Sequence, residues 1–142
     1  MTVPKLPYKE SIMERVCKFL KDAGTYYIAT VDGGKPRVRP FGTIHIYNGR
    51  LYIQTGKRKD FAKQVEQNPY VEVCAFKDGD WLRLSGKLVY DDDRAARVSM
   101  LEAYPELRSM YDPDDGNTAV YYFEDAEAVF ASFTKASETV KF

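Results

Sequence analysis

The spacing of apolar residues changes near Gly24, from the period of a helix to the period of a strand. Before this glycine, four apolar residues share one helix face, namely Ile12, Val16, Phe19 and Leu20. Ser11 is suited to cap this helix at its start, and Gly24 is suited to end it. The first segment is therefore predicted to be an amphipathic helix.

After Gly24, β-branched and aromatic residues alternate with polar ones in short runs between turn-forming residues, which is typical of antiparallel strands. Asn48-Gly49 is the strongest of these turn signals, because this pair favours a two-residue hairpin. Two further helices are predicted, one over residues 60–67 and one after the acidic run 91–93. This run is suited to cap the second of these helices and to complement its dipole. Strands are predicted over residues 25–31, 37–47, 50–55, 70–76, 81–90, 118–123 and 127–133.

This order predicts a mainly β protein of the α+β class, in which six to seven antiparallel strands close into a barrel with about three flanking helices. No repeat, low-complexity stretch or linker divides the chain, so a single domain is expected over residues 1–142.

Composition narrows the possible functions of the chain. Its 142 residues include 21 Lys+Arg and 21 Asp+Glu, which gives a formal net charge of zero. A neutral chain that is 44% hydrophobic is neither a disordered tail nor a typical nucleic-acid binder. No apolar run reaches the length of a membrane helix, and the first ten residues lack the apolar core of a signal peptide. We therefore expect a cytoplasmic protein that binds neither nucleic acid nor membrane.

The chain also lacks the residues of a common metal site. His45 is the only histidine, and the two cysteines, Cys17 and Cys74, are not spaced as a ligand pair. No metal site is predicted.

The neutral total hides a local excess of positive charge. Residues 33–63 carry eight basic residues and one acidic residue, whereas residues 91–127 carry eleven acidic and three basic ones. The densest basic part is Thr55-Gly56-Lys57-Arg58-Lys59, where a strand is predicted to end and a helix to begin. Such a junction offers free backbone N–H groups and the positive end of a helix dipole, which suit a phosphate. The alternative is an ordinary solvated loop.

A second group of residues suits a flat ligand. Within the predicted strand 37–47, alternation places Arg39 on one face with Phe41 and His45, opposite the aliphatic face of Val38 and Ile44. The neighbouring hairpin strand brings Gln54 and Thr55 close. An arginine, an aromatic ring, an amide and a hydroxyl fit a heteroaromatic ring whose phosphate would reach the basic loop. The alternative is a hydrated strand face.

The order and spacing of several segments resemble the pyridoxamine 5′-phosphate oxidase-like superfamily of FMN-binding split β-barrels. The likeness is strongest to the short bacterial members that are grouped with nitroimidazole-resistance proteins, and it covers about residues 24–90. The segments that carry it are Tyr27-Ile28-Ala29-Thr30-Val31, Pro36-Arg37-Val38-Arg39-Pro40-Phe41, Leu51-Tyr52-Ile53-Gln54-Thr55, Lys57, Lys59 and Asn68-Pro69-Tyr70-Val71.

The resemblance implies a homodimer that holds FMN in grooves at the subunit interface and acts on a small-molecule redox substrate. By the same likeness, Arg39, Pro40 and Phe41 would contact the flavin ring and ribityl chain, together with Gln54 and Thr55. The phosphate would lie on the basic loop, held by Lys57, Arg58 and Lys59. The flavin would carry the redox chemistry, with no side chain required as an acid or base.

Three alternatives remain at this stage. True pyridoxamine 5′-phosphate oxidation is disfavoured because residues 121–142 lack the basic residues that hold the substrate phosphate in that enzyme. A non-enzymatic module is the second alternative, either a flavin or haem carrier or sensor, or a barrel that binds single-stranded nucleic acid. A deazaflavin in place of FMN is the third.

Overall fold

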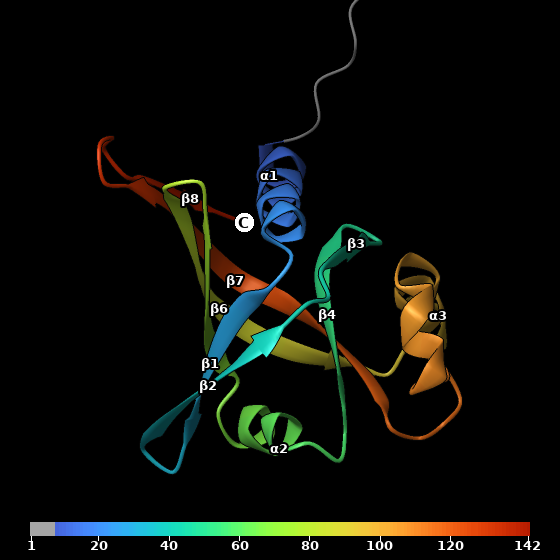
Figure 1. Ribbon diagram of the computed structural model, residues 1–142. Helices are drawn as coiled ribbons and strands as arrows, with labels where there is room; N and C mark the ends of the chain where they lie inside the picture. Colours follow the sequence, from blue (N-terminus) through green and yellow to red (C-terminus); the bar gives the residue numbers. More distant parts are fainter. Residues whose placement is uncertain (1–7) are drawn as a thin grey trace, which may run out of the picture.

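The computed structural model describes residues 8–142. Figure 1 shows a strongly curled sheet with one helix near each end and a third helix outside it. The helices are α1 (Tyr8–Ala23), α2 (Asp60–Gln67) and α3 (Arg94–Ala103), followed by a 3₁₀ helix over Pro105–Ser109. The strands are β1 (Tyr26–Asp32), β2 (Lys35–Phe41), β3 (His45–Tyr47), β4 (Arg50–Gly56), β5 (Tyr70–Lys77), β6 (Asp80–Asp91), β7 (Thr118–Ser132) and β8 (Glu138–Lys141).

The sheet is antiparallel and curls into a barrel because of one short connection. Its strands follow the order β2-β1-β5-β6-β7-β4-β3, with β8 added beside β7. Strands β2 and β3 thus lie at opposite edges of the sheet, although only residues 42–44 separate them in the chain. A linker of this length spans roughly 10–15 Å at most. The two edges must therefore lie near each other, which confirms the predicted antiparallel barrel of the α+β class.

Hydrogen bonds from distant tyrosines hold this connection. The Tyr26 hydroxyl donates to the carbonyl of Thr43. The Tyr104 hydroxyl accepts from the N–H of Ile44 at 3.0 Å and donates to the carbonyl of the same residue at 2.9 Å. The Thr43 hydroxyl accepts from the N–H of Gln54 at 3.0 Å, which ties the connection to β4. These polar contacts therefore fix the connection between the two edge strands of the barrel, β2 and β3.

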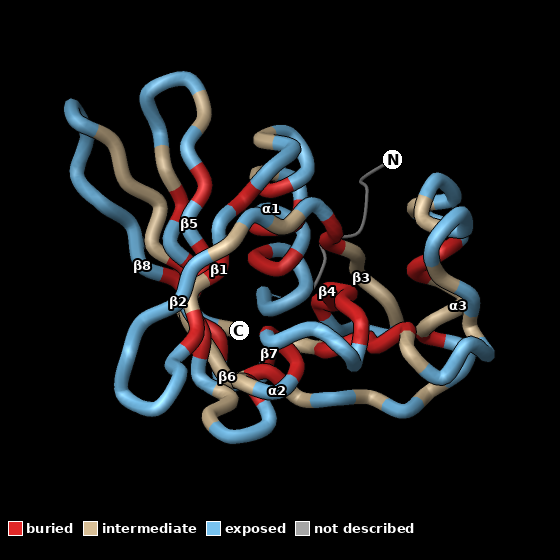
Figure 2. Tube along the Cα trace, turned by 60° about the horizontal axis from the view of Figure 1, so that its bottom comes forward, coloured by how far each residue is buried: buried red, intermediate tan, exposed pale blue. Residues whose placement is uncertain are grey.

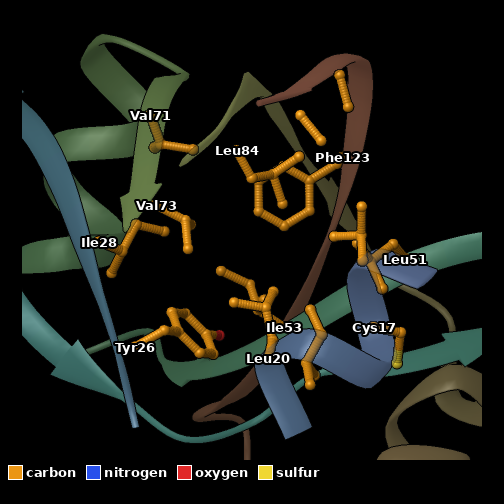
Figure 3. Packing of buried hydrophobic residues seen from close by; sticks show 14 of the residues in the cluster. Cys17, Leu20, Tyr26, Ile28, Leu51, Ile53, Val71, Val73, Leu84 and Phe123 are labelled. Atoms are coloured by element: carbon orange, nitrogen blue, oxygen red, sulfur yellow. The ribbon is translucent and has the colours of Figure 1, made fainter. Parts of the chain in front are cut away.

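The main core fills the barrel between α1 and α2. Apolar residues of α1 enter one side, where Leu20 and Cys17 lie next to Leu51 and Ile53 of β4 (Figure 3). Phe61 and Val65 of α2 join the same cluster from below the sheet. Burial is concentrated at the centre of the molecule, whereas the hairpin tips are exposed (Figure 2).

Helix α3 packs outside the barrel and forms a second, smaller cluster. Its Ala96 and Met100 pack with Tyr52 of β4 and Val120 of β7. Strand β4 is consequently buried on both faces, from Leu51 to Gly56. Its alternate residues face the barrel interior on one side and α3 on the other.

Several local predictions are confirmed. Gly24 ends α1 with a φ of 81° and donates to the carbonyl of Leu20. Asn48 and Gly49 both adopt positive φ, as a type I′ hairpin turn requires. Asp93 caps α3 by accepting a hydrogen bond from the N–H of Ala95 at 3.0 Å.

Other boundaries were predicted wrongly. Ser11 does not cap α1, because the helix already includes Tyr8. The strand expected over 37–47 is two strands, since the chain breaks after Phe41 to cross between the sheet edges. Its alternation does not run through the break, so Val38 points outward and is 68% exposed, while Ile44 is buried. Phe41, expected on the opposite face from the core, packs against the core from the inner side.

The C-terminal strands also differ from the prediction. The two strands expected over 118–123 and 127–133 are one strand, β7. Glu124 and Asp125, which lie between the two expected strands, are at a bulge where β7 carries one more residue than β6, and Asp125 has a φ of 53°. Strand β8 was missed, because its four residues carry no strong alternation.

A loop before β7 is organised around one carboxylate. Asp115 accepts hydrogen bonds from the N–H groups of Asp112, Asn117 and Thr118 and from the Thr118 hydroxyl, at 2.7–3.0 Å. Partial desolvation raises the pKa of Asp115, but these hydrogen bonds outweigh it and hold that pKa well below its usual value. The carboxylate thereby fixes Asn117 next to the end of β4.

Replacing Tyr104 with Phe should lower the free energy of unfolding by about 1–3 kcal/mol, because both polar groups of Ile44 lose their partner. Denaturant unfolding measures this loss. Tyr111→Phe is the matched control and should change stability little. Equal stability of the Tyr104→Phe and wild-type proteins would show that the barrel split does not depend on this hydroxyl.

Replacing Asp115 with Ala should lower the free energy of unfolding by about 1–3 kcal/mol at neutral pH. A depressed folded-state pKa contributes stability above the unfolded value of about 4, and this contribution is lost as pH falls below that value. The difference between wild-type and variant should therefore shrink steadily below about pH 4 in unfolding curves. A difference that is independent of pH would contradict this role of the carboxylate.

Candidate functional site

Arg39 lies on the inner side of β2 and is held by three neutral acceptors. Its guanidinium donates to the carbonyl of Ile28 at 3.2 Å, to the Thr30 hydroxyl at 2.8 Å and to Gln64 Oε1 at 2.6 Å. The Thr30 hydroxyl in turn donates to Gln64 Oε1 at 2.6 Å. Strand β1 and helix α2 thus fix the orientation of this side chain.

A pocket of about 460 Å³ opens beside Arg39, between β2 and the start of α2. Phe41 and Phe61 contact each other in its lining, with ring centroids 4.8 Å apart and ring planes tilted by 50°. The Arg39 guanidinium lies 5.1 Å from the centre of the Phe61 ring. Ten residues line the pocket: Asp32, Arg37, Val38, Arg39, Pro40, Phe41, Lys59, Asp60, Phe61 and Gln64. Four of the predicted site residues, Arg39, Pro40, Phe41 and Lys59, therefore come together here.

The positive charges of this pocket are only partly balanced. Arg37 pairs with Asp32 at 3.1 Å. Within residues 8–142, no carboxylate lies at ion-pair distance from Arg39 or Lys59. Partial burial lowers the pKa of Arg39, and the nearby Asp60 acts against this shift. Among residues 8–142 the pocket therefore presents two cations without an ionic partner, of which Arg39 is held by hydrogen bonds, and this favours an anionic ligand.

The basic loop differs from the expected phosphate cradle. The N–H of Lys57 donates to the carbonyl of Asn117 at 2.7 Å, and the N–H of Arg58 donates to Asn117 Oδ1 at 3.1 Å. The N–H of Lys59 donates to the carbonyl of Gly56. The expectation that these N–H groups are free is therefore wrong, because Asn117 and the turn itself use them. These three N–H groups are therefore not available to an anion.

The cationic side chains of the basic loop, residues 55–59, lie on two sides of α2. Lys59 lines the pocket with Arg39, whereas Lys57 lines a separate pocket with Tyr90 and Tyr121. Arg58 is exposed and lines neither pocket. That all three side chains hold one phosphate remains a prediction from the sequence.

Gln54 and Thr55 lie on opposite faces of β4, away from the pocket with Arg39. Thr55 shares the barrel face with Ile53, and Gln54 shares the face under α3 with Tyr52. Both are buried, and neither the amide of Gln54 nor the hydroxyl of Thr55 has a hydrogen-bond partner among residues 8–142. Unpaired buried polar groups are destabilising and call for an explanation.

His45 is separated from Arg39, although alternation placed both on one face. It lies on β3, at the opposite edge of the sheet, with its Nε2 atom 2.7 Å from the Ser99 hydroxyl of α3. Burial lowers its pKa, and nearby Lys21 adds to this effect. His45 therefore connects β3 to α3 and does not line the pocket with Arg39.

Two residues that shape this region were missed in the sequence. Gln64 positions Arg39, and Asn117 fixes the basic loop from far along the chain. The polar Gln64 next to the buried Val65 on an amphipathic helix was the available signal for the first. Nothing local predicts the contact of Asn117, because it depends on the pairing of β4 with β7.

The geometry suits a ligand with an anionic end and a flat ring. Arg39 and Lys59 supply charge-assisted hydrogen bonds, and Phe41 and Phe61 supply aromatic surface. No group of three or more potential metal ligands occurs in residues 8–142. No helix in the same range is long and apolar enough to cross a membrane.

Comparison with known proteins places the chain in one family. Residues 12–129 match the family model described as pyridoxamine 5′-phosphate oxidase. A NimC/NimA family protein from Clostridium acetobutylicum is 41% identical to the chain, with a TM-score of 0.91 and 94% of each chain covered. Comparison with curated proteins gave no match.

The similarity to more distant structures shows the fold alone. A pyridoxamine 5′-phosphate oxidase-related, FMN binding protein from Nostoc punctiforme is 16% identical, with a TM-score of 0.65, and the match covers 97% of this chain and 98% of that one. A heme binding protein from Mycobacterium smegmatis is 11% identical, with a TM-score of 0.71, and the match covers 98% of this chain and 60% of that one. The family match and the NimC/NimA relative together show that this chain belongs to the pyridoxamine 5′-phosphate oxidase family and has its split-barrel fold.

Proposed function

We propose that the protein is a homodimeric FMN-binding flavoprotein that catalyses a redox reaction of a small molecule. The observation that carries this proposal is the pocket where Arg39 and Lys59, which pair with no carboxylate in the described part of the chain, lie beside the rings of Phe41 and Phe61. An FMN-binding protein of the same fold supports the choice of cofactor.

We assign the phosphate of FMN to the Arg39 and Lys59 side chains, because they share one pocket. This gives Arg39 a different role from the ring and ribityl contacts that the sequence resemblance implied. Gln64 and Thr30 hold the guanidinium in place before any ligand arrives, so little side-chain freedom is lost on binding. Asp60 lies in the same pocket and opposes a second negative charge. This repulsion limits the affinity and favours one small phosphate over larger polyanions.

When bound, the flavin supplies hydride or single-electron transfer, and the protein binds and orients it. Pro40 and Phe41 form the apolar wall of the pocket, which shields part of the ring from water. Asp32 and Asp60 are the pocket's carboxylates, and Asp32 is engaged by Arg37. The chain's own contribution is therefore positioning and electrostatics.

The unpaired polar groups of β4 fit the same proposal. The Gln54 amide offers both a donor and an acceptor, which complement the carbonyl and N–H groups along a flavin ring. Because these atoms are enclosed in the isolated chain, contact with a ring requires local opening around β4. Their role toward the cofactor remains a prediction.

The proposed dimer rests on an apolar outer face of β1, β2 and β5. Strand pairing aligns Tyr27 with Pro40 and Cys74, and Ala29 with Val38. Large side chains of this region remain exposed: Tyr27, Val31, Val38, Tyr70 and Phe76. Because Val38 also lines the pocket with Arg39, a second copy seated on this face would close the mouth of that pocket. An exposed apolar patch of this kind is typical of an interaction surface.

Absorbance of the purified protein, before and after incubation with FMN, tests the proposal directly. Flavin bands that stay with the protein on gel filtration are expected, and they should bleach when reduced nicotinamide nucleotide is added without oxygen. A protein that retains no flavin would refute the proposal. A haem band instead of flavin bands would favour a haem carrier, and release of a deazaflavin would correct the cofactor.

Replacing Lys59 with Ala should weaken FMN binding about tenfold or more, since a hydrogen bond to a charged group contributes about 1.5–3 kcal/mol. Fluorescence titration of FMN measures the dissociation constant. Lys35→Ala is the matched control, because Lys35 lies at the distant tip of the β1–β2 hairpin. Equal FMN affinity in the Lys59→Ala and Lys35→Ala variants would remove Lys59 from the phosphate site.

Replacing Val38 with Glu should convert the dimer into a monomer, because two like charges would then face each other across an apolar contact. Sedimentation velocity measures the change, and FMN binding should weaken in the same variant. The exposed Met110→Glu variant serves as the control, since that residue lies outside this face. A monomeric wild-type protein, or a Val38→Glu variant that stays dimeric, would contradict the assignment of the interface.

A further inference from the structure

A second pocket opens on the other side of α2, at the mouth of the barrel, beside the last residues of β6 and the first residues of β7. Its volume is about 370 Å³. Apolar side chains of α2 and β6 form the floor, and all of them are buried: Ala62, Val65 and Leu88. Barrel mouths with an apolar floor and a few polar groups are frequent ligand sites.

Two tyrosines form an aromatic wall in this pocket. The ring of Tyr90 lies 5.6 Å from that of Tyr121, and Tyr121 also packs edge-on against Phe61 at 6.3 Å. Tyr90 is 40% exposed, so part of its side chain is accessible to a ligand. The wall therefore offers stacking surface to a flat molecule.

The hydroxyl of Tyr121 makes no hydrogen bond within residues 8–142. The residue is 7% exposed, and the enclosed polar atoms without a partner belong to Gln54 and Thr55, so the Tyr121 hydroxyl is accessible to a ligand. Burial raises the pKa of Tyr121 to about 12, with smaller contributions from Tyr90 and Glu66. The group is therefore protonated at neutral pH and able to donate a hydrogen bond.

The rim of the pocket is positively charged. Lys57 and Lys63 contribute two positive charges and Glu66 contributes one negative charge, so the net charge of the rim is one positive charge. Neither lysine lies at ion-pair distance from a carboxylate of residues 8–142. The ammonium of Lys57 lies 5.2 Å from the centre of the Tyr90 ring, so charge and aromatic surface are adjacent.

We propose that this pocket is a second binding site, which takes a small aromatic carboxylate. The ring stacks on Tyr90, and the carboxylate accepts from Lys57 and from the Tyr121 hydroxyl. Apolar floor, aromatic wall, unpaired donor and cationic rim are each matched by one part of such a ligand.

The proposed site is separate from the proposed cofactor site. Asp60, Phe61 and Gln64 of α2 face the pocket with Arg39, whereas Ala62, Lys63 and Val65 face this one. The inference does not rest on FMN binding, because none of the residues that line this pocket lines the other.

The test uses 2-naphthoate as the probe and the full chain, with and without saturating FMN. Ring signals of Tyr90 and Tyr121 are followed by NMR on protein with ¹³C-labelled tyrosine, and are assigned through the Tyr90→Phe and Tyr121→Phe variants. Saturable shifts of these two signals are expected. 2-Naphthalenemethanol, the neutral analogue, should bind about fivefold more weakly, because it lacks the charge that meets Lys57.

Variants separate this site from the cofactor site. Lys57→Ala should weaken naphthoate binding about fivefold, whereas Lys59→Ala should leave naphthoate binding unchanged and weaken FMN binding. Tyr121→Phe should weaken naphthoate binding about threefold while keeping the ring packing. Thermal unfolding confirms that each variant is folded.

Three results would overturn the inference. The first is the absence of saturable shifts of Tyr90 and Tyr121 up to the solubility limit of the probe. The second is equal affinity for naphthoate and its neutral analogue, which would show an apolar hollow without anion recognition. The third is a Lys57→Ala variant that binds naphthoate like the wild type. Failure of FMN to bind would refute the proposed function and leave these measurements interpretable.

Discussion

The short connection over residues 42–44 is the constraint on which the rest of the structure depends. It joins the two edge strands β2 and β3, so the sheet has to curl. Hydrogen bonds from Tyr26, Tyr104 and Thr43 hold it where it crosses. Near this crossing, Arg39 and Phe41 at the end of β2 face inward toward α2. The pocket between β2 and α2 therefore depends on the curl of the sheet.

Basic and acidic residues are concentrated in different parts of the barrel. The chain is neutral in total, yet its basic segment surrounds the end of β4 and the start of α2. Asn117 takes up the backbone N–H groups there, so the side chains of the loop are turned to opposite sides of the helix. A single loop thereby supplies one cation to each of two pockets. The acidic segment contributes elsewhere, as the Asp93 cap and the Asp115 loop.

Much of the fold was predictable from local patterns. Helix and strand periods, the Asn48-Gly49 turn and the Asp93 cap are determined by neighbouring residues, and the structure has them as expected. The break at residues 42–44 and the bulge at Glu124 and Asp125 were not predictable, because tertiary pairing decides them. The hidden strand β8 likewise depends on its partner β7.

The candidate site was predictable in its residue types and less so in its grouping. Arg39, Phe41 and Lys59 meet as the sequence suggested. Gln54 and Thr55 are instead enclosed on opposite faces of β4, and Lys57 faces away, since these positions follow from packing on α3 and α2. The role of Gln64 in orienting Arg39 could not be predicted, because it depends on the packing of α2 against β1.

The central claim is that local cations hold the phosphate of a flavin. The most direct measurement compares the dissociation constants of FMN and riboflavin, which differ only in that phosphate, at low and high salt. Binding of FMN should be at least about tenfold tighter than binding of riboflavin at low salt, and the difference should shrink as salt screens the charges. Equal affinities at low salt would contradict the claim.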